Sequence, residues 1–283
     1  MPDEKRIKVV IDPKAGFCGG VRRAIRMVEN ALKKGEDVFT RGELIHNPRE
    51  MERLREMGLK VSPELKSATG KSLFIRTHGE TPEVYKLAEA AGVNIVDATC
   101  RNVRKSQKVI AAEAEAGRKI YIFGKKMHPE VIGLHGFCLG NGNVLEQLED
   151  IDCVTDNKPA LLIPQTTANQ AKFDLVKKMM RHKISDLKIY DAICPFVSHR
   201  EQELLDFAKS CEAVVFVGGK HSSNTAVLFA SCSSVNRNSF FVEKPEELPM
   251  EKLKCYNSIG VSGSASTPMW QLEEIAEEIV KRT

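Results

Sequence analysis

Near its N-terminus the chain carries the stretch Ala15-Gly16-Phe17-Cys18-Gly19-Gly20-Val21-Arg22-Arg23-Ala24-Ile25. The apolar run at 7–11 before it is typical of a buried strand. Apolar side chains then recur at helical spacing from about Val21 to Lys33, and Gly35 marks the end of the predicted helix. Cys18 is therefore predicted to lie on a strand-to-helix turn, where free backbone N–H groups and the helix dipole favour a thiolate. A lone cysteine in such a turn is more often a structural residue, so its role depends on the rest of the sequence.

The same arrangement occurs twice more. Residues 93–100 predict a strand that ends in Cys100, and residues 187–194 predict a strand that ends in Cys194. Both carry the phrase Asp-Ala-x-Cys-x-x-Val, and both lead into a predicted helix. An internal repeat of this kind indicates that the chain is built from three similar units.

Polar clusters follow the three cysteines at matched distances. His46, His128 and Ser222 each lie 28 residues after a cysteine, directly beyond a predicted strand. A second set of polar strand ends follows 60, 66 and 72 residues after the cysteines, at His78, Thr166 and Ser266. Each unit is therefore predicted to contribute one cysteine and two polar loops.

Strands that alternate with helices in this way predict an α/β fold with mostly parallel sheets. We expect three α/β units, at residues 1–99, 100–193 and 194–283, each carrying one of the three cysteines. The last helix has no returning strand after it, and the first strand has no unit of its own before Cys18. We therefore expect the two termini to meet, with the C-terminal helix closing towards the N-terminal unit. Because ligand-binding residues gather beyond the carboxyl ends of parallel strands, we expect one central site.

Three cysteines on equivalent turns favour a threefold metal site. Tetrahedral zinc would need a fourth protein ligand or a water molecule. A cubane iron–sulfur cluster held by three cysteines would instead leave one iron free for substrate. The other five cysteines occupy no equivalent positions and are interpreted as packing residues: Cys138, Cys153, Cys211, Cys232 and Cys255.

The polar loops are rich in hydrogen-bond donors, which suit the oxygens of a diphosphate. They supply His46 and His78 from the first unit, His128, Thr166 and Thr167 from the second, and Ser222, Ser223, Asn224 and Ser266 from the third. Glu130 is the only acid at a matched position, so it is the natural proton donor.

Composition narrows the choice of partners and compartment. The net charge is only +4. The sequence contains no block of basic residues interleaved with aromatic residues, so it does not predict nucleic-acid binding. No apolar run approaches the roughly 18 residues of a membrane span, and no signal peptide is predicted. Eight cysteines without a secretion signal favour reduced thiols in the cytoplasm. The absence of a CxxC pair argues against zinc ribbons and ferredoxin-like cluster motifs.

The motifs resemble those of the LytB (IspH) family of 4-hydroxy-3-methylbut-2-enyl diphosphate reductases. The resemblance covers essentially the whole chain and rests on 16–25, His46-Asn47, 97–100, 128–131, 165–167 and 222–224. It implies a trefoil of three pseudo-equivalent α/β domains with mostly parallel sheets around a central, oxygen-sensitive [4Fe–4S] cluster. The implied reaction is reductive removal of the substrate hydroxyl, which gives isopentenyl and dimethylallyl diphosphates in the last step of the methylerythritol phosphate pathway. It also implies an external electron donor such as ferredoxin or flavodoxin.

The resemblance assigns roles residue by residue. Cys18, Cys100 and Cys194 would hold the cluster. Glu130 would relay protons and Thr166 would contact the substrate hydroxyl, with His128 beside them in catalysis. The expected substrate-binding residues are His46, His78, His128, Thr166, Thr167, Ser222, Ser223, Asn224 and Ser266.

Two positions depart from the family pattern. Many members have proline after the second cysteine, where this chain has Arg101. A threonine that often lies three residues after the third cysteine is Val197 here. These departures leave open how the cluster potential is tuned and how a partner docks.

Two other functions stay open at this stage. A cluster-free protein that binds nucleotides or diphosphates could use the same donor loops, although no GxxxxGK[ST] or GxGxxG motif follows a strand. An iron–sulfur sensor or scaffold would need the cysteines but not the polar loops.

Overall fold

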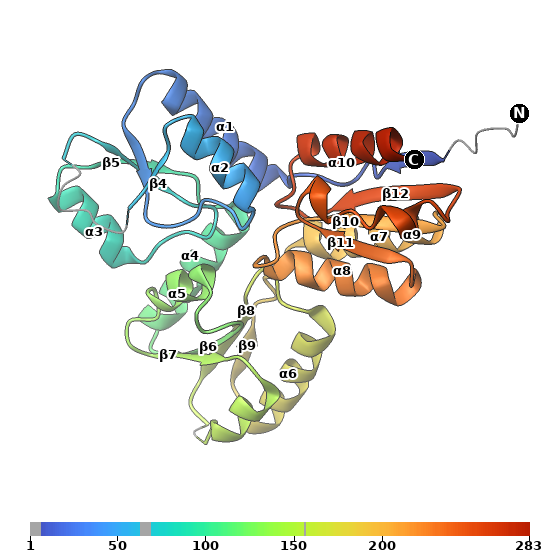
Figure 1. Cartoon of the computed structure of the whole chain (residues 1–283). Helices are drawn as coiled ribbons and strands as arrows, with labels where there is room; N and C mark the ends of the chain where they lie inside the picture. Colours follow the sequence, from blue (N-terminus) through green and yellow to red (C-terminus); the bar gives the residue numbers. More distant parts are fainter. Residues whose placement is uncertain (1–6, 63–68, 156) are drawn as a thin grey trace, which may run out of the picture. The chain divides into compact units, whose positions relative to one another are not determined.

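The computed structural model describes residues 7–62, 69–155 and 157–283 (Figure 1). Within these residues, three four-stranded sheets form, and every pairing of neighbouring strands is parallel. The predicted α/β class with parallel sheets is confirmed. Among the described helices, none combines the length and the apolar character needed to cross a membrane.

The sheets are assembled as follows. The first has the order β1 (Lys8–Ile11), β12 (Ser258–Gly263), β10 (Ala213–Val217), β11 (Ser239–Val242). The second has the order β3 (Lys60–Val61), β2 (Val38–Thr40), β4 (Ser72–Ile75), β5 (Asn94–Asp97). The third has the order β7 (Gly142–Leu145), β6 (Lys119–Phe123), β8 (Ala160–Pro164), β9 (Leu187–Ile189).

Ten α-helices and two short 3₁₀ segments are described between and after the strands. They are α1 (Gly19–Lys33), α2 (Pro48–Glu56), α3 (Pro82–Ala90), α4 (Arg101–Glu115), α5 (Pro129–His135), η1 (Leu148–Cys153), α6 (Gln170–Lys183), α7 (Pro195–Lys209), α8 (Ser223–Val235), η2 (Pro245–Glu247), α9 (Met250–Leu253) and α10 (Met269–Arg282). The helix α1 begins at Gly19 rather than at the predicted Val21. The first turn of α1 is hydrogen-bonded to Cys18, since the Val21 N–H donates to Cys18 Sγ (3.5 Å).

The N-terminal strand joins the sheet made by the C-terminal part of the chain. β1 pairs with β12, from Lys8 opposite Ser258 to Ile11 opposite Val261. The first described strand therefore lies beside the last strand of the chain. β1 is thus an edge strand of the sheet that also contains β10, β11 and β12. It does not belong to the sheet of β2, the next strand along the chain.

The chain divides into two compact units. The terminal unit consists of Met1–Val21, Ile45–Glu52 and Pro195–Thr283, and it contains the β1–β12–β10–β11 sheet. The central unit consists of Arg22–Leu44 and Arg53–Cys194, and it contains the other two sheets. The division into three domains at residues 1–99, 100–193 and 194–283 remains a prediction.

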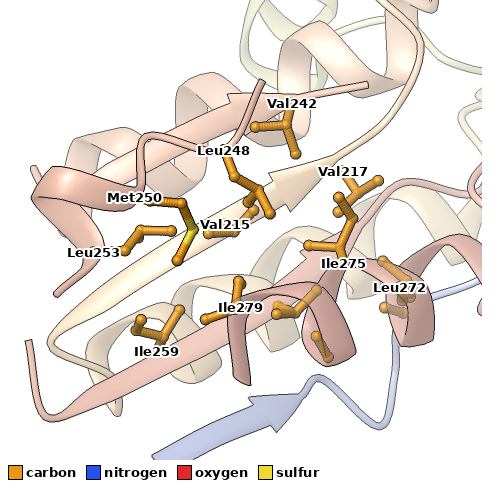
Figure 2. Close-up of a cluster of buried hydrophobic side chains, with 13 residues drawn as sticks. Val215, Val217, Val242, Leu248, Met250, Leu253, Ile259, Leu272, Ile275 and Ile279 are labelled. Atoms are coloured by element: carbon orange, nitrogen blue, oxygen red, sulfur yellow. The ribbon is translucent and has the colours of Figure 1, made fainter. Parts of the chain in front are cut away.

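Alternation along β10 builds two cores in the terminal unit. Val215 and Val217 pack with Ile275 and Ile279 of α10 on one face of the sheet (Figure 2). Val214 and Phe216 face the other way and pack against α7 and α8. Full burial of one such aliphatic side chain contributes about 1.5–3 kcal/mol. The strand is therefore fixed from both sides, and its carboxyl end is held in place.

The same alternation in the central unit puts α4 and α6 on opposite faces of one sheet. Ile120 and Ile122 of β6 pack with Ile110 of α4. Tyr121 of the same strand packs with Phe173 of α6. The sheet therefore separates the exposed side chains of α6 from α4.

Candidate active site

Each candidate cysteine lies directly before a helix. Cys18 precedes α1, Cys100 is the N-cap of α4, and Cys194 precedes α7. None of the three forms a disulfide, and all three are half-buried. At the start of a helix, unpaired backbone N–H groups and the dipole stabilise negative charge on sulfur. These three thiols are therefore suited to binding a metal as thiolates.

The cysteine turns are anchored in a common way. The backbone N–H of Cys18 donates to the carbonyl of Ala265 (3.3 Å), that of Cys100 to Thr77 (3.0 Å), and that of Cys194 to Thr166 (2.8 Å). The acceptors are the polar strand ends that the sequence repeat predicted, because Ala265 and Thr77 directly precede Ser266 and His78. Each cysteine is thus tied to a loop that carries a candidate substrate-binding residue.

The remaining cysteines lie elsewhere in the two units. Cys138 and Cys232 are buried in hydrophobic cores. Burial raises the pKa of the Cys138 thiol to about 12, so this side chain stays protonated. Cys153 and Cys255 are exposed, and Cys211 is half-buried.

Asn102 adds a contact to one candidate ligand. Its Nδ2 donates to Cys194 Sγ (3.3 Å), across 92 residues of sequence within the central unit. Asn102 was not predicted from the sequence, because a single polar residue in the first turn of a helix belongs to no repeating pattern.

Glu130 and Thr166 form a buried pair. The Thr166 N–H donates to Glu130 Oε1 (2.6 Å), and the Thr166 hydroxyl donates to Glu130 Oε2 (2.8 Å). Glu130 is only 2% exposed. Burial raises the pKa of this carboxyl to about 7, although the two hydrogen bonds from Thr166 oppose the shift. At neutral pH this group therefore exchanges between an acid and its carboxylate.

His128 is held in one orientation by the start of α5. It is the N-cap residue, and its Nδ1 accepts a hydrogen bond from the Glu130 N–H (3.1 Å). Pro129 at the first helical position favours this geometry. Because Nδ1 accepts, the proton of a neutral ring resides on Nε2.

His78 lies against His128. The two rings meet edge to face, with centroids 5.4 Å apart and an interplanar angle of 82°. Gly79, which follows, has φ +78°, and a Cβ there would come within 2.5 Å of Gln107 Nε2. The positive φ favours glycine at this position, and a larger residue would also have to displace the Gln107 side chain.

Ser222 and Ser266 are brought together in the terminal unit. The hydroxyl of Ser266 donates to that of Ser222 (3.5 Å) and lies 3.0 Å from that of Ser264. Ser222 is also the N-cap of α8 and accepts from the Thr225 N–H (3.3 Å). Ser223 begins α8, but its side chain lies outside the described part of the chain.

Asn224 is the most informative side chain of this group. It is buried, and neither its Nδ2 nor its Oδ1 has a hydrogen-bond partner in the described structure. A buried amide without partners costs free energy, so such a group calls for an explanation. Two orphaned polar atoms beside Ser222 fit a site that is completed by a polar ligand.

His46 belongs to the same unit as Ser222 and Asn224. Its carbonyl lies close to the chain at Gly219, where a Cβ would approach His46 O to 2.4 Å. The next residue, Asn47, donates from Nδ2 to the carbonyl of Ser266 (3.1 Å) and exchanges two amide hydrogen bonds with Gln271 (both 3.0 Å). Asn47 thus ties the His46 loop to the Ser266 loop.

Thr167 is half-buried, and its hydroxyl accepts a hydrogen bond from Gln165 Nε2 (2.8 Å). Gln165 Oε1 in turn accepts from the Lys125 N–H (3.2 Å). These contacts hold the loops after β6 and β8 together. A role for Thr167 in substrate binding stays a prediction.

A buried ion pair that the sequence did not predict supports the Cys18 turn. Arg200 of α7 donates from Nη2 to Asp12 and to the Ser262 hydroxyl (2.7 Å), and the Ser262 hydroxyl also donates to Asp12 Oδ2 (2.8 Å). Both charged side chains are only 1% exposed. Because Asp12 directly follows β1, the pair joins the end of β1, the end of β12 and α7.

Comparison with known proteins gives a consistent result. Residues 9–280 match the family model described as LytB protein. The chain is similar to a 4-hydroxy-3-methylbut-2-enyl diphosphate reductase of Bacteroides fragilis (39% identity, covering 96% of this chain and 97% of the relative). A protein of the same name from Aquifex aeolicus is 33% identical, with 96% of each chain covered.

Two solved structures are also similar. One is an (E)-4-hydroxy-3-methyl-but-2-enyl diphosphate reductase described as the terminal enzyme of the non-mevalonate pathway (TM-score 0.77, 32% identity, covering 97% of this chain and 99% of that chain). The other is the E-1-hydroxy-2-methyl-but-2-enyl-4-diphosphate reductase from Plasmodium falciparum (TM-score 0.87, 25% identity, covering 96% and 87%).

Proposed function

The chain belongs to the LytB family, and we propose that it is a 4-hydroxy-3-methylbut-2-enyl diphosphate reductase, the terminal enzyme of the non-mevalonate route to isoprenoids. The reaction consumes two electrons and two protons. The allylic C–O bond breaks, a C–H bond forms, and the oxygen leaves as water, which gives isopentenyl or dimethylallyl diphosphate. The observation that carries the proposal is the repeated turn in which a free cysteine starts a helix and bonds to a polar strand end.

We propose Cys18, Cys100 and Cys194 as the ligands of a [4Fe–4S] cluster. The residues fit this group, because each is a half-buried cysteine outside any disulfide, at a helix N-terminus where a thiolate is stabilised. Such a cluster, when bound, supplies electrons and Lewis acidity through an iron that no cysteine ligates. Asn102 supports this assignment, since its amide donates to Cys194 Sγ and would help to hold negative charge there.

The diphosphate would be bound by the polar strand ends. The residues proposed for this role are His46, His78, His128, Ser222, Asn224 and Ser266. The orphaned amide of Asn224 supports this, because a phosphate oxygen would accept from its Nδ2. A histidine ring nitrogen that carries a proton would donate to an oxygen of the diphosphate.

Protons would be delivered by Glu130. Its raised pKa, about 7, keeps a fraction of the side chain protonated at neutral pH. The Thr166 hydroxyl, 2.8 Å from Glu130 Oε2, would carry the proton towards the substrate hydroxyl. His128 is positioned by the Glu130 N–H and would direct its Nε2 proton to a substrate oxygen.

The electrons would come from a separate carrier such as ferredoxin or flavodoxin. We also infer a cytoplasmic protein, because all eight cysteines of the chain are free thiols, which suits a reducing compartment.

Anaerobic purification tests the proposed function. The protein is expected to be brown, to contain about four irons per chain, and to release water and isoprenoid diphosphates from the substrate when it is reduced. An iron-loaded protein without turnover would instead point to a sensor or scaffold. Diphosphate binding without iron would point to a cluster-free binding protein.

A further inference from the structure

The helix that follows Cys100 exposes a row of positive charges. Arg101, Arg104, Lys105 and Lys108 are all exposed, and their spacing of three and four residues puts them on one side of α4. The acidic side chains of this helix begin only at Glu113. The first two turns of α4 therefore present positive charge to solvent.

Little of this charge is neutralised within the described residues. Arg104 pairs with Asp97 (2.8 Å), and this carboxylate also accepts hydrogen bonds from Thr99. For Arg101, Lys105 and Lys108, the described structure contains no ion-pair partner. Three of the four cations are thus available to an external anion.

The helix that follows Cys18 extends the same surface. Arg22 and Arg26 of α1 are exposed. Arg23, between them, donates from Nη2 to the carbonyl of Thr99 (2.9 Å), one residue before Cys100. The first turns of α1 and α4 are therefore tied together within the central unit. The helix after the third cysteine differs, because α7 exposes Glu203 and Asp206.

We propose that this surface docks an acidic one-electron carrier protein. The α1/α4 basic surface is defined by Arg22, Arg26, Arg101, Arg104, Lys105 and Lys108. The inference rests on the proposed function, which requires two electrons from outside for each substrate molecule. Two reduced carriers each give up one electron. These two electrons and one proton form the new C–H bond, while the hydroxyl leaves with the C–O bonding pair and the second proton as water.

Position and charge both support this assignment. The surface begins one residue after a proposed cluster ligand, so a carrier seated there would approach the redox centre. Complementary charge accelerates encounter and orients the partners. A single-stranded nucleic acid fits less well, because neither α1 nor α4 contains an aromatic residue on which bases could stack. Arg101, directly after Cys100, adds one charge to this surface.

Charge reversal at Lys105 and Lys108 tests the proposal without touching the residue next to Cys100. The variant K105E/K108E is compared with K172E/K178E, which makes the same change in net charge at two exposed positions of α6, across the sheet from α4. Oxidised flavodoxin, a small acidic carrier, is titrated into each anaerobically purified protein without substrate. Turnover is then measured separately with reduced flavodoxin and with dithionite-reduced methyl viologen.

The α4 variant is expected to bind flavodoxin about tenfold more weakly or worse at low ionic strength, and the difference should shrink as salt is added. Its turnover should fall with flavodoxin and match the wild type with methyl viologen, whereas the α6 variant should behave like the wild type throughout. Equal flavodoxin binding by both variants would overturn the proposal. So would an equal loss with methyl viologen, or an RNA oligonucleotide that binds this surface more tightly than flavodoxin. Because binding is measured without substrate, failure of the proposed reaction is recognised separately, as wild-type protein that turns over with neither reductant.

Discussion

Replacing Glu130 by glutamine removes a transferable proton and keeps the shape of the side chain. The Oε1 of glutamine can still accept from the Thr166 N–H, which lies 2.6 Å from the carboxylate in the wild type. The Nε2 of glutamine takes the place of Glu130 Oε2 and donates, so the Thr166 hydroxyl must rotate to accept a hydrogen bond from it. The pair stays connected, but it can no longer pass a proton.

The size of the effect follows from the environment of Glu130. With a pKa of about 7, roughly half of the molecules carry the proton at neutral pH in the wild type. Loss of a positioned acid typically slows a reaction by about 10²–10⁴-fold. We therefore expect Glu130→Gln to turn over at least about a hundredfold more slowly, with substrate affinity changed only a few-fold. The wild-type rate should fall as the pH rises through about 7, and the variant should lose this dependence.

The assay is single-turnover reduction at several pH values, with iron content and substrate dissociation constants measured on the same preparations. Near-normal turnover by Glu130→Gln, at full iron content, would refute a role for this carboxyl in proton transfer. A large loss of substrate affinity with unchanged turnover would show that Glu130 only orders the His128 loop.

The same variant carries a stability signature. The pKa of Glu130 is raised in the folded protein from 4.5 to about 7, so the folded state holds the proton more tightly than the unfolded chain. Its contribution is fully present below pH 4.5 and is lost as the pH rises through about 7, by roughly 3 kcal/mol. Glu130→Gln cannot ionise, so chemical denaturation should show a smaller loss of stability across this pH window than in the wild type.

Three further variants test other parts of the structure. Asn224→Ala should weaken substrate binding about ten- to a hundredfold in calorimetry and leave thermal stability equal or higher, because the wild-type amide is buried without partners; a lower melting temperature with normal binding would contradict this. Asp12→Ala should cost about 3–5 kcal/mol in urea denaturation, since it leaves Arg200 buried and unpaired, and adding Arg200→Met should restore part of the loss if the pair is the cause. Gly79→Ala should destabilise more than Gly117→Ala, because both residues have φ near +79° but only the first has a neighbouring atom within 4 Å of the added Cβ; equal melting temperatures would refute the steric argument.

Local patterns in the sequence were sufficient to predict the α/β class. A parallel strand comes before Cys100 and Cys194, and a helix follows each of them directly, because nearby residues set both features. The strands end earlier than predicted, at Asp97 and Ile189 rather than at the cysteines. Equal spacing also predicted that polar residues follow strands at corresponding points. In the structure, the backbone N–H of each cysteine bonds to a residue of one of these polar strand ends: Ala265, Thr77 or Thr166.

Contacts between distant residues could not be predicted in this way. Asp12 and Arg200 are 188 residues apart, and Asn47 and Gln271 are 224 residues apart. Such pairs form when whole helices and strands pack together, and no repeating pattern in a single sequence indicates them. The pairing of β1 with β12 was likewise not predicted from the sequence, because it joins residues about 250 positions apart.

Iron content and turnover of anaerobically purified cysteine variants test the proposed site most directly. Cys18→Ser, Cys100→Ser and Cys194→Ser are expected to lose most of their iron and all reductase activity. Cys153→Ser, at an exposed position outside the repeat, is the matched control and should retain both. Full iron content and normal turnover in any of the three variants, in a protein that folds like the wild type, would contradict the assignment of that cysteine as a ligand.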